Sequence, residues 1–131
     1  MQDPGREGRT IRKTILVAED EPIVLKTISS IIQSMGYRVV AAMDGLQAEE
    51  LFTRHAPELA LMVVEIALPN VSGYTFVERL PRLAPRIPVL FTTVMGEYEL
   101  PDAVRGQFPV LQKPFRADTM IAEVKALVQS I

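Results

Sequence analysis

The chain contains no cysteine and only one histidine, His55, and these shortages exclude several kinds of chemistry. Without cysteine there is no disulfide framework, no thiolate zinc site and no cysteine nucleophile, a pattern that suits a reducing compartment. His55 falls late in an amphipathic stretch among polar neighbours. We therefore expect a surface residue there, and no Ser-His-Asp arrangement.

Positive charge and long apolar runs are also scarce. The 14 basic residues are fewer than the 16 acidic ones, so the net charge of -2 gives no electrostatic footprint for non-specific nucleic-acid binding. No run approaches the roughly 18 consecutive apolar residues that a bilayer crossing requires. We expect a cytoplasmic protein that neither contacts nucleic acid directly nor enters a membrane.

The composition is that of one globular domain. The 131 residues are 48% hydrophobic and 23% charged, which provides enough apolar area for a core and too little chain for two full domains. Residues 1–13 hold two glycines, a proline and four basic side chains, with little that is apolar to pack. They are predicted to be a flexible leader, and residues 14–131 to be the folded domain.

Short apolar runs alternate with amphipathic stretches along the rest of the chain, as strands and helices do when they take turns. Five runs are expected to be strands: Thr14–Ala18, Arg38–Met43, Leu59–Ile66, Val89–Thr93 and Val110–Gln112. Parallel strands need right-handed crossovers that cover both faces of the sheet. The pattern therefore predicts an α/β doubly wound parallel sheet.

Capping residues place the helices between these strands. The first helix follows Pro22 and stops at Gly36, and the second begins after Asp44. The third follows Ser72 and should end or kink at Pro81. The last has an apolar face formed by Ile121, Val124, Val128 and Ile131. Residues 94–107 are poorly patterned, so the fourth helix is expected to be short or irregular.

Acidic residues follow two of the predicted strands, at the edge where such sheets bind ligands. Residues 19–21 are Glu-Asp-Glu, and the third strand ends in Glu65. Carboxylates that share one crevice repel unless a cation or a proton is present, and an oxygen-lined acidic pocket suits Mg²⁺. The hydroxyl of Thr93 and the ammonium of Lys113 come from the fourth and fifth strands. Both groups are suited to holding a phosphoryl oxygen.

Four segments, in order, resemble motifs of response regulator receiver domains. Ile15-Leu-Val-Ala-Glu-Asp-Glu21 resembles their first strand and acidic pair, and Val64-Glu-Ile-Ala-Leu-Pro-Asn-Val-Ser-Gly73 resembles their phosphoacceptor loop. Pro88-Val-Leu-Phe-Thr-Thr93 and Lys113-Pro-Phe115 resemble the fourth and fifth strand ends. The resemblance extends from Thr14 to the end of the chain. It implies a flavodoxin-like sheet in the order 2-1-3-4-5, with helices on both faces.

The resemblance also implies roles and partners in two-component signalling. The phosphoryl group would come from a sensor histidine kinase or a histidine phosphotransfer protein and pass to the acceptor position, which is Glu65 here, while Thr93 and Lys113 would hold its oxygens. The implied Mg²⁺ ligands are Glu19, Asp20, Glu65 and the backbone carbonyl of Ala67. A downstream effector would bind the surface formed by the fourth helix, the fifth strand and the fifth helix, and a homodimer is left open.

Two departures from the family pattern affect the expected chemistry. Glu65 carries its carboxylate about 1.5 Å farther out than aspartate would, and a misplacement of about 1 Å can cost on the order of a hundredfold in rate. Val110 replaces the aromatic switch residue usual at that position. We therefore predict an interaction module with weak or absent phosphorylation, and no enzyme activity beyond impaired self-catalysed phosphotransfer and dephosphorylation.

Other interpretations of the same residues remain open at this point. Glu65 could simply form an ion pair with Lys113, or could partly mimic the phosphorylated state, although it has less charge than a phosphate. Glu19 and Asp20 could cap the first helix. An alternative function is a small flavodoxin-like metal-dependent hydrolase or cofactor-binding protein, but the loop after the first strand has no glycine-rich phosphate cradle.

Overall fold

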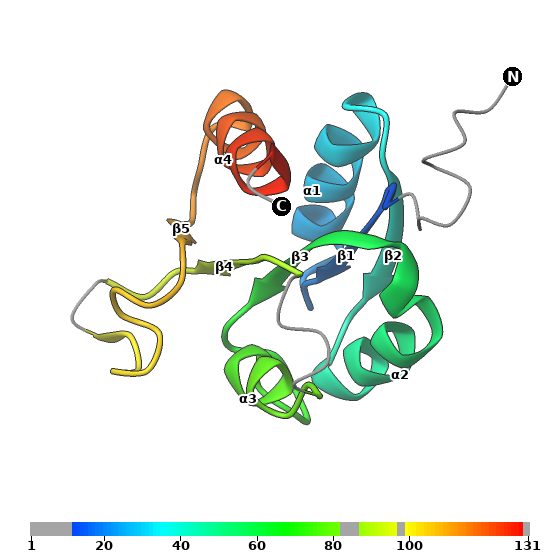
Figure 1. The fold of residues 1–131 in the computed structure, drawn as a ribbon. Coiled ribbons are helices and arrows are strands. Elements are labelled where there is room, and N and C mark those ends of the chain that lie inside the picture. The colour runs from blue at the N-terminus through cyan, green and yellow to red at the C-terminus, as the bar shows by residue number, and fades with distance from the viewer. Residues whose placement is uncertain (1–11, 82–86, 97–98, 130–131) are drawn as a thin grey trace, which may run out of the picture.

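The computed structural model describes residues 12–81, 87–96 and 99–129, which form a five-stranded sheet with helices on both faces (Figure 1). The strands are β1 (Thr14–Ala18), β2 (Arg38–Ala42), β3 (Leu59–Glu65), β4 (Val89–Thr93) and β5 (Val110–Gln112). The helices are α1 (Pro22–Ser34), α2 (Gly45–His55), α3 (Gly73–Glu78) and α4 (Ala117–Gln129), with a 3-10 turn at Ala56–Glu58. All strand pairs are parallel and the order is β2-β1-β3-β4-β5. The predicted flavodoxin-like topology is confirmed.

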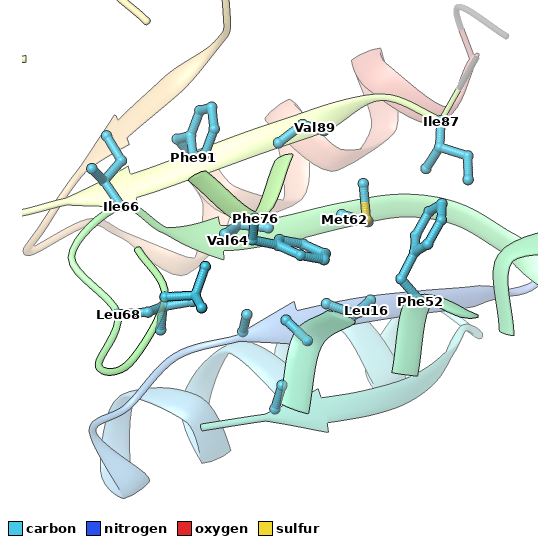
Figure 2. Packing of buried hydrophobic residues seen from close by; sticks show 14 of the residues in the cluster. Leu16, Phe52, Met62, Val64, Ile66, Leu68, Phe76, Ile87, Val89 and Phe91 are labelled. Carbon is cyan, nitrogen blue, oxygen red and sulfur yellow. The ribbon is translucent and has the colours of Figure 1, made fainter. Parts of the chain in front are cut away.

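Side chains alternate across the buried strands and so build a core on each face of the sheet. Under α1 and α4, Ile28 and Val124 belong to one apolar cluster with Val63 of β3. Under α2 and α3, Phe52 and Phe76 meet edge to face, with ring centroids 6.4 Å apart. Figure 2 shows both rings against β3, beside Met62 and Val64. The sheet is thus held rigidly from both sides.

The predicted helix ends are confirmed where the structure describes them. Asp44 caps α2 by accepting the N–H of Gln47 at 2.8 Å, and the Gln47 side chain accepts the N–H of Met43 at 2.7 Å. Gly36, just past α1, has a φ of 94°, which favours glycine. Helix α3 ends before Pro81, while β2 and β3 each end one residue earlier than predicted because their ladder pairs stop there.

The crossover between β4 and β5, residues 94–109, contains no α-helix in its described parts, 94–96 and 99–109. In these described parts, turns therefore take the place of the fourth helix, which was expected to be short or irregular. The predicted leader lies outside the described residues as far as residue 11. Arg12 and Lys13 already contact the sheet, through an Arg12 bond to the Leu59 carbonyl at 3.0 Å and a bond from the Arg38 N–H to the Lys13 carbonyl at 2.9 Å. None of the helices in the described ranges is long and apolar enough to cross a membrane.

Candidate functional site

Three charged side chains from different strands converge at the carboxyl edge of the sheet. Glu19 follows β1, Glu65 ends β3 and Lys113 follows β5. Glu19 is fully buried and Glu65 is 5% exposed, although isolated charges are seldom buried without partners. The Lys113 side chain is only 9% exposed. The predicted convergence of these residues is confirmed.

Lys113 joins the two buried acids. Its Nζ lies 2.9 Å from Oε1 of Glu19 and 2.5 Å from Oε1 of Glu65. The remaining oxygens are also engaged: Oε2 of Glu19 accepts the Glu21 N–H at 3.0 Å, and Oε2 of Glu65 accepts the Ala67 N–H at 3.2 Å. Every carboxylate oxygen of the pair therefore accepts a bond from the protein itself. Glu65 does form an ion pair with Lys113, as one of the open interpretations expected.

Burial and pairing compete in setting the pKa values of Glu19 and Lys113. Burial raises the pKa of Glu19, and the bonds from Glu21 and Lys113 only partly oppose it. Burial alone would lower the pKa of Lys113, but its bonds to Glu65 and Glu19 outweigh burial and raise that pKa. Lys113 is therefore charged at neutral pH. It supplies positive charge at the point where two carboxylates would otherwise repel.

The other predicted site residues lie around this ion pair with different contacts. The Thr93 hydroxyl, on a buried strand end, accepts the Met95 N–H at 3.0 Å. Asp20 is half-buried in the loop after β1, and Ala67 is exposed in the loop after β3. The two glutamates thus meet Lys113, whereas the Thr93 oxygen accepts a bond from the chain that follows it.

These residues, as arranged, do not fit the Mg²⁺ site that the resemblance implies. Within the described ranges, no three acidic, histidine or cysteine side chains are grouped so that they could hold a metal ion. Mg²⁺ needs oxygen ligands about 2.0–2.1 Å away in near-octahedral geometry. Both oxygens of Glu65 instead face N–H donors of the protein. The arrangement differs in this respect from the site expected from the sequence.

The loop that carries Glu65 is fastened by contacts that the sequence pattern did not predict. Asn70 has a φ of 68°, and its Nδ2 donates to Oδ2 of Asp44 at 3.1 Å. The Gly45 N–H donates to the Pro69 carbonyl at 3.2 Å. At Gly73, a Cβ would lie 2.0 Å from the Glu65 carbonyl oxygen, so only glycine allows this approach. We call the bonds from Asn70 to Asp44 and from Gly45 to Pro69 the latch of the β3–α3 loop. A Pro-Asn pair after a strand is a turn signal and could have indicated this latch.

Two polar side chains near the site were also missed. Thr92 is the register partner of Glu65 and is fully buried, and its hydroxyl has no hydrogen-bond partner among the described residues. Gln112, at the end of β5, donates from Nε2 to the Met95 carbonyl at 3.1 Å. The Met95 peptide is consequently held at its N–H by Thr93 and at its carbonyl by Gln112. No sequence pattern indicates either contact.

Sequence comparisons find a matching family and several relatives of this chain. The response regulator receiver domain profile matches residues 15–125. A DNA-binding dual master transcriptional regulator, RpaA of Synechocystis, is 32% identical over 121 residues, which are 88% of this chain and 48% of that protein. The chemotaxis protein CheY of Bacillus subtilis is 28% identical over 113 residues, 84% of this chain and 92% of CheY. The chain spans about half the length of relatives such as RpaA.

Solved structures agree with the sequence comparisons. The receiver domain of the hybrid histidine kinase CckA superimposes with a TM-score of 0.75 at 26% identity, covering 88% of this chain and 99% of that one. CheY of Borrelia burgdorferi, solved with CheX, BeF3 and Mg²⁺, has a TM-score of 0.79 at 20% identity, covering 89% and 90%. The second likeness shows the fold alone. By its matched profile, its sheet order and its strand-end residues, the chain belongs to the response regulator receiver domain family.

Proposed function

We propose that this receiver domain works in two-component signalling chiefly as a protein interaction module, with phosphorylation at position 65 weak or absent. The observation that carries the proposal is the state of the acceptor residue. Glu65 is 5% exposed, and its carboxylate is bonded to Lys113 and to the Ala67 N–H. An acceptor oxygen must be free and in line with the phosphoryl donor to attack it. Glu65 is longer than aspartate and is bonded on both oxygens, and both features disfavour this attack.

The contacts of Glu65 bear on the idea that it mimics a phosphorylated acceptor. Its carboxylate faces Lys113 and the Ala67 N–H, while the Thr93 oxygen accepts the Met95 N–H. A phosphate would add about one further negative charge and three acceptor oxygens, which a carboxylate cannot match. The ion pair therefore favours a fixed state of the site over imitation of the phosphorylated one.

The proposed upstream partner is a sensor histidine kinase or a histidine phosphotransfer protein, reached through the carboxyl edge of the sheet. Ile23 and Val94 are 80% and 70% exposed there. Both line a hollow of about 290 Å³ that also touches Lys113 and Phe115. Exposed apolar side chains around a polar centre are typical of an interaction site. Cytoplasmic location, as expected from the composition, is part of the same proposal.

The proposed downstream partner is an effector protein that binds the face formed by the crossover, β5 and α4. The turns of the crossover replace the expected helix on this face. Met95, Phe108 and Val110 line a second hollow of about 280 Å³ there. A partner adapted to this face would therefore differ from one that reads a helical surface. Direct nucleic-acid contact and membrane contact are not part of the proposal.

The alternative function, a metal-dependent hydrolase or a cofactor-binding protein, is not favoured. The family match covers most of the chain. Glu19 and Glu65 are already paired with Lys113, so neither is free to hold a metal ion for hydrolysis. Magnesium-dependent turnover of simple phosphate esters by the purified chain would count against the receiver function.

The test uses acetyl phosphate as a small phosphoryl donor, with Mg²⁺ in the buffer and intact mass as the readout. We expect the native chain to keep its mass, and Glu65→Asp to gain the mass of one phosphoryl group. The matched control is Glu58→Asp, because Glu58 precedes β3 at the end of the strand opposite Glu65 and is bonded to His55 and Thr14. Equal labelling of the native chain and Glu65→Asp would contradict the proposal.

A further inference from the structure

Lys113 connects the ends of three strands through its two ion pairs. Lys113 follows β5, and its two partners end β3 and follow β1. The contact with Glu19 joins residues 94 positions apart in the sequence. The side chains of all three are at least nine-tenths buried, at 9%, 0% and 6% exposed. An ammonium in this position satisfies two buried carboxylates that have no other source of positive charge among the bonds of the described residues.

The same position is where a bound cation would have to act. A dication on Oε1 of Glu65 would lie within about 5 Å of the Lys113 ammonium, because metal-to-oxygen distances are about 2 Å. At that distance a double and a single positive charge repel strongly in a buried setting. To bind at Oε1, the cation would have to displace the Lys113 ammonium, which is already 2.5 Å from that oxygen. The protein would then lose the ion pairs of Lys113 with Glu65 and Glu19 in exchange for one ion.

The length of the acid contributes to this arrangement. Glutamate extends the carboxylate about 1.5 Å beyond the reach of aspartate, which brings Oε1 of Glu65 to Lys113 while Oε2 still meets the Ala67 N–H. Gly73 fixes the backbone below it, since a Cβ there would collide with the Glu65 carbonyl. The reach of Glu65 is therefore set by the fold.

We infer that Lys113 is the built-in cation of this site, so that the folded domain neither needs nor binds Mg²⁺ at Glu19 and Glu65. The inference rests on the proposed function, because it describes the same acceptor site, and it makes the site independent of the divalent ion. The interaction surface is then present at all times, without a change of state driven by metal and phosphoryl group.

Thermal unfolding with and without MgCl₂, at matched ionic strength, tests the inference. We expect Mg²⁺ to leave the melting temperature of the native chain unchanged. Lys113→Gln should melt well below the native chain, since it leaves two buried carboxylates unpaired. Mg²⁺ should then raise the melting temperature of the variant by about 5–10 °C at a concentration a hundred times its dissociation constant. The matched control is Lys125→Gln on exposed α4 surface, which should respond to neither change.

A second measurement on the native chain decides the matter if Lys113→Gln does not fold. Mn²⁺ prefers the same oxygen ligands as Mg²⁺, and its free form is counted by electron paramagnetic resonance. Equimolar native chain should leave the Mn²⁺ signal intact. Loss of the signal, restored by excess Mg²⁺, would overturn the inference, as would a folded Lys113→Gln that Mg²⁺ does not stabilise. Neither result would alter the labelling of the native chain by acetyl phosphate, on which the proposed function depends.

Discussion

Two regions meet at the carboxyl edge of the sheet and are built very differently. The region from β1 to α3 carries Glu19 and Glu65, and a Cβ on Gly45 or Gly73 would lie 2.0 Å from a backbone oxygen there. In the crossover, residues 94–109, only Leu100 and Val104 of the described residues are buried. The described crossover residues form turns, and β5 beyond them has three residues, paired with β4 alone. One region is close-packed, and the other is loosely packed.

The difference teaches which part of the site depends on which part of the fold. Glu19 and Glu65 lie at the ends of β1 and β3, in the close-packed region. Lys113 lies beyond the crossover and reaches back to both acids. The ion pair is therefore the link between a rigid half and a more adaptable half. Stability should reside mainly in the first region, and local opening in the second.

The two aromatic pairs should show the largest contrast between the regions. Phe76→Ala should cost about 3–5 kcal/mol of unfolding free energy, because Phe76 is fully buried against Phe52. Phe108→Ala should cost about 1–2 kcal/mol, because Phe108 is half-buried beside Phe91, with ring centroids 5.2 Å apart. Urea denaturation of both variants measures the difference. Equal losses would contradict the contrast in packing.

The elements of the close-packed region were predictable from local pattern. Buried strands show as apolar runs, and Asp44 with Gln47 forms the cap that its spacing predicts. The crossover was predictable only as irregular, because Gly96 and Pro101 break periodicity without specifying what replaces a helix. The order of the strands rested on the family resemblance, since periodicity does not determine which strands are neighbours.

At the site, sequence could predict which residues meet but not how they bond. Parallel strands bring Glu19, Glu65 and Lys113 to one edge, and this follows from topology. Whether Lys113 meets one acid or both depends on the rotamers of three long side chains. The bond from Gln112 to Met95 likewise joins residues 17 positions apart through an exposed side chain. Such contacts leave no periodic trace in a sequence.

Glycine substitutions should give the next largest contrast. Gly73→Ala should cost about 1–3 kcal/mol, because its Cβ would lie 2.0 Å from the Glu65 carbonyl oxygen and 2.7 Å from Cγ1 of Val64. Gly96→Ala should leave stability nearly unchanged, because its Cβ would lie 3.3 Å from the movable Oε1 of Glu99. Thermal unfolding of the pair measures both effects. A neutral Gly73→Ala would mean that the Glu65 loop yields more easily than its packing indicates.

The latch of the β3–α3 loop should have a smaller effect. Asp44→Ala removes the cap on the Gln47 N–H and the bond from Asn70, and should cost about 1 kcal/mol. The matched control in the crossover is Asp102→Ala, which should cause no measurable change, because Asp102 is 97% exposed in its pair with Arg105. Chemical denaturation compares the two. A larger loss for Asp102→Ala would reverse the assignment of the rigid and adaptable regions.

The bond from Gln112 to Met95, which holds the start of the crossover, should have the smallest effect on global stability. Its local effect should still be measurable. Gln112→Ala removes the bond from Nε2 to the Met95 carbonyl and should cost about 0.5–1 kcal/mol. Because the crossover is loosely packed, the loss should be felt as local opening, measured as faster hydrogen exchange of the Met95 amide, which Thr93 alone would then restrain. The Gly73 amide, bonded to the Ile66 carbonyl at 2.8 Å in the close-packed region, is the internal control and should exchange at its native rate. Faster exchange at both amides would mean that the two regions open together, and that Lys113 couples them more strongly than its single side chain indicates.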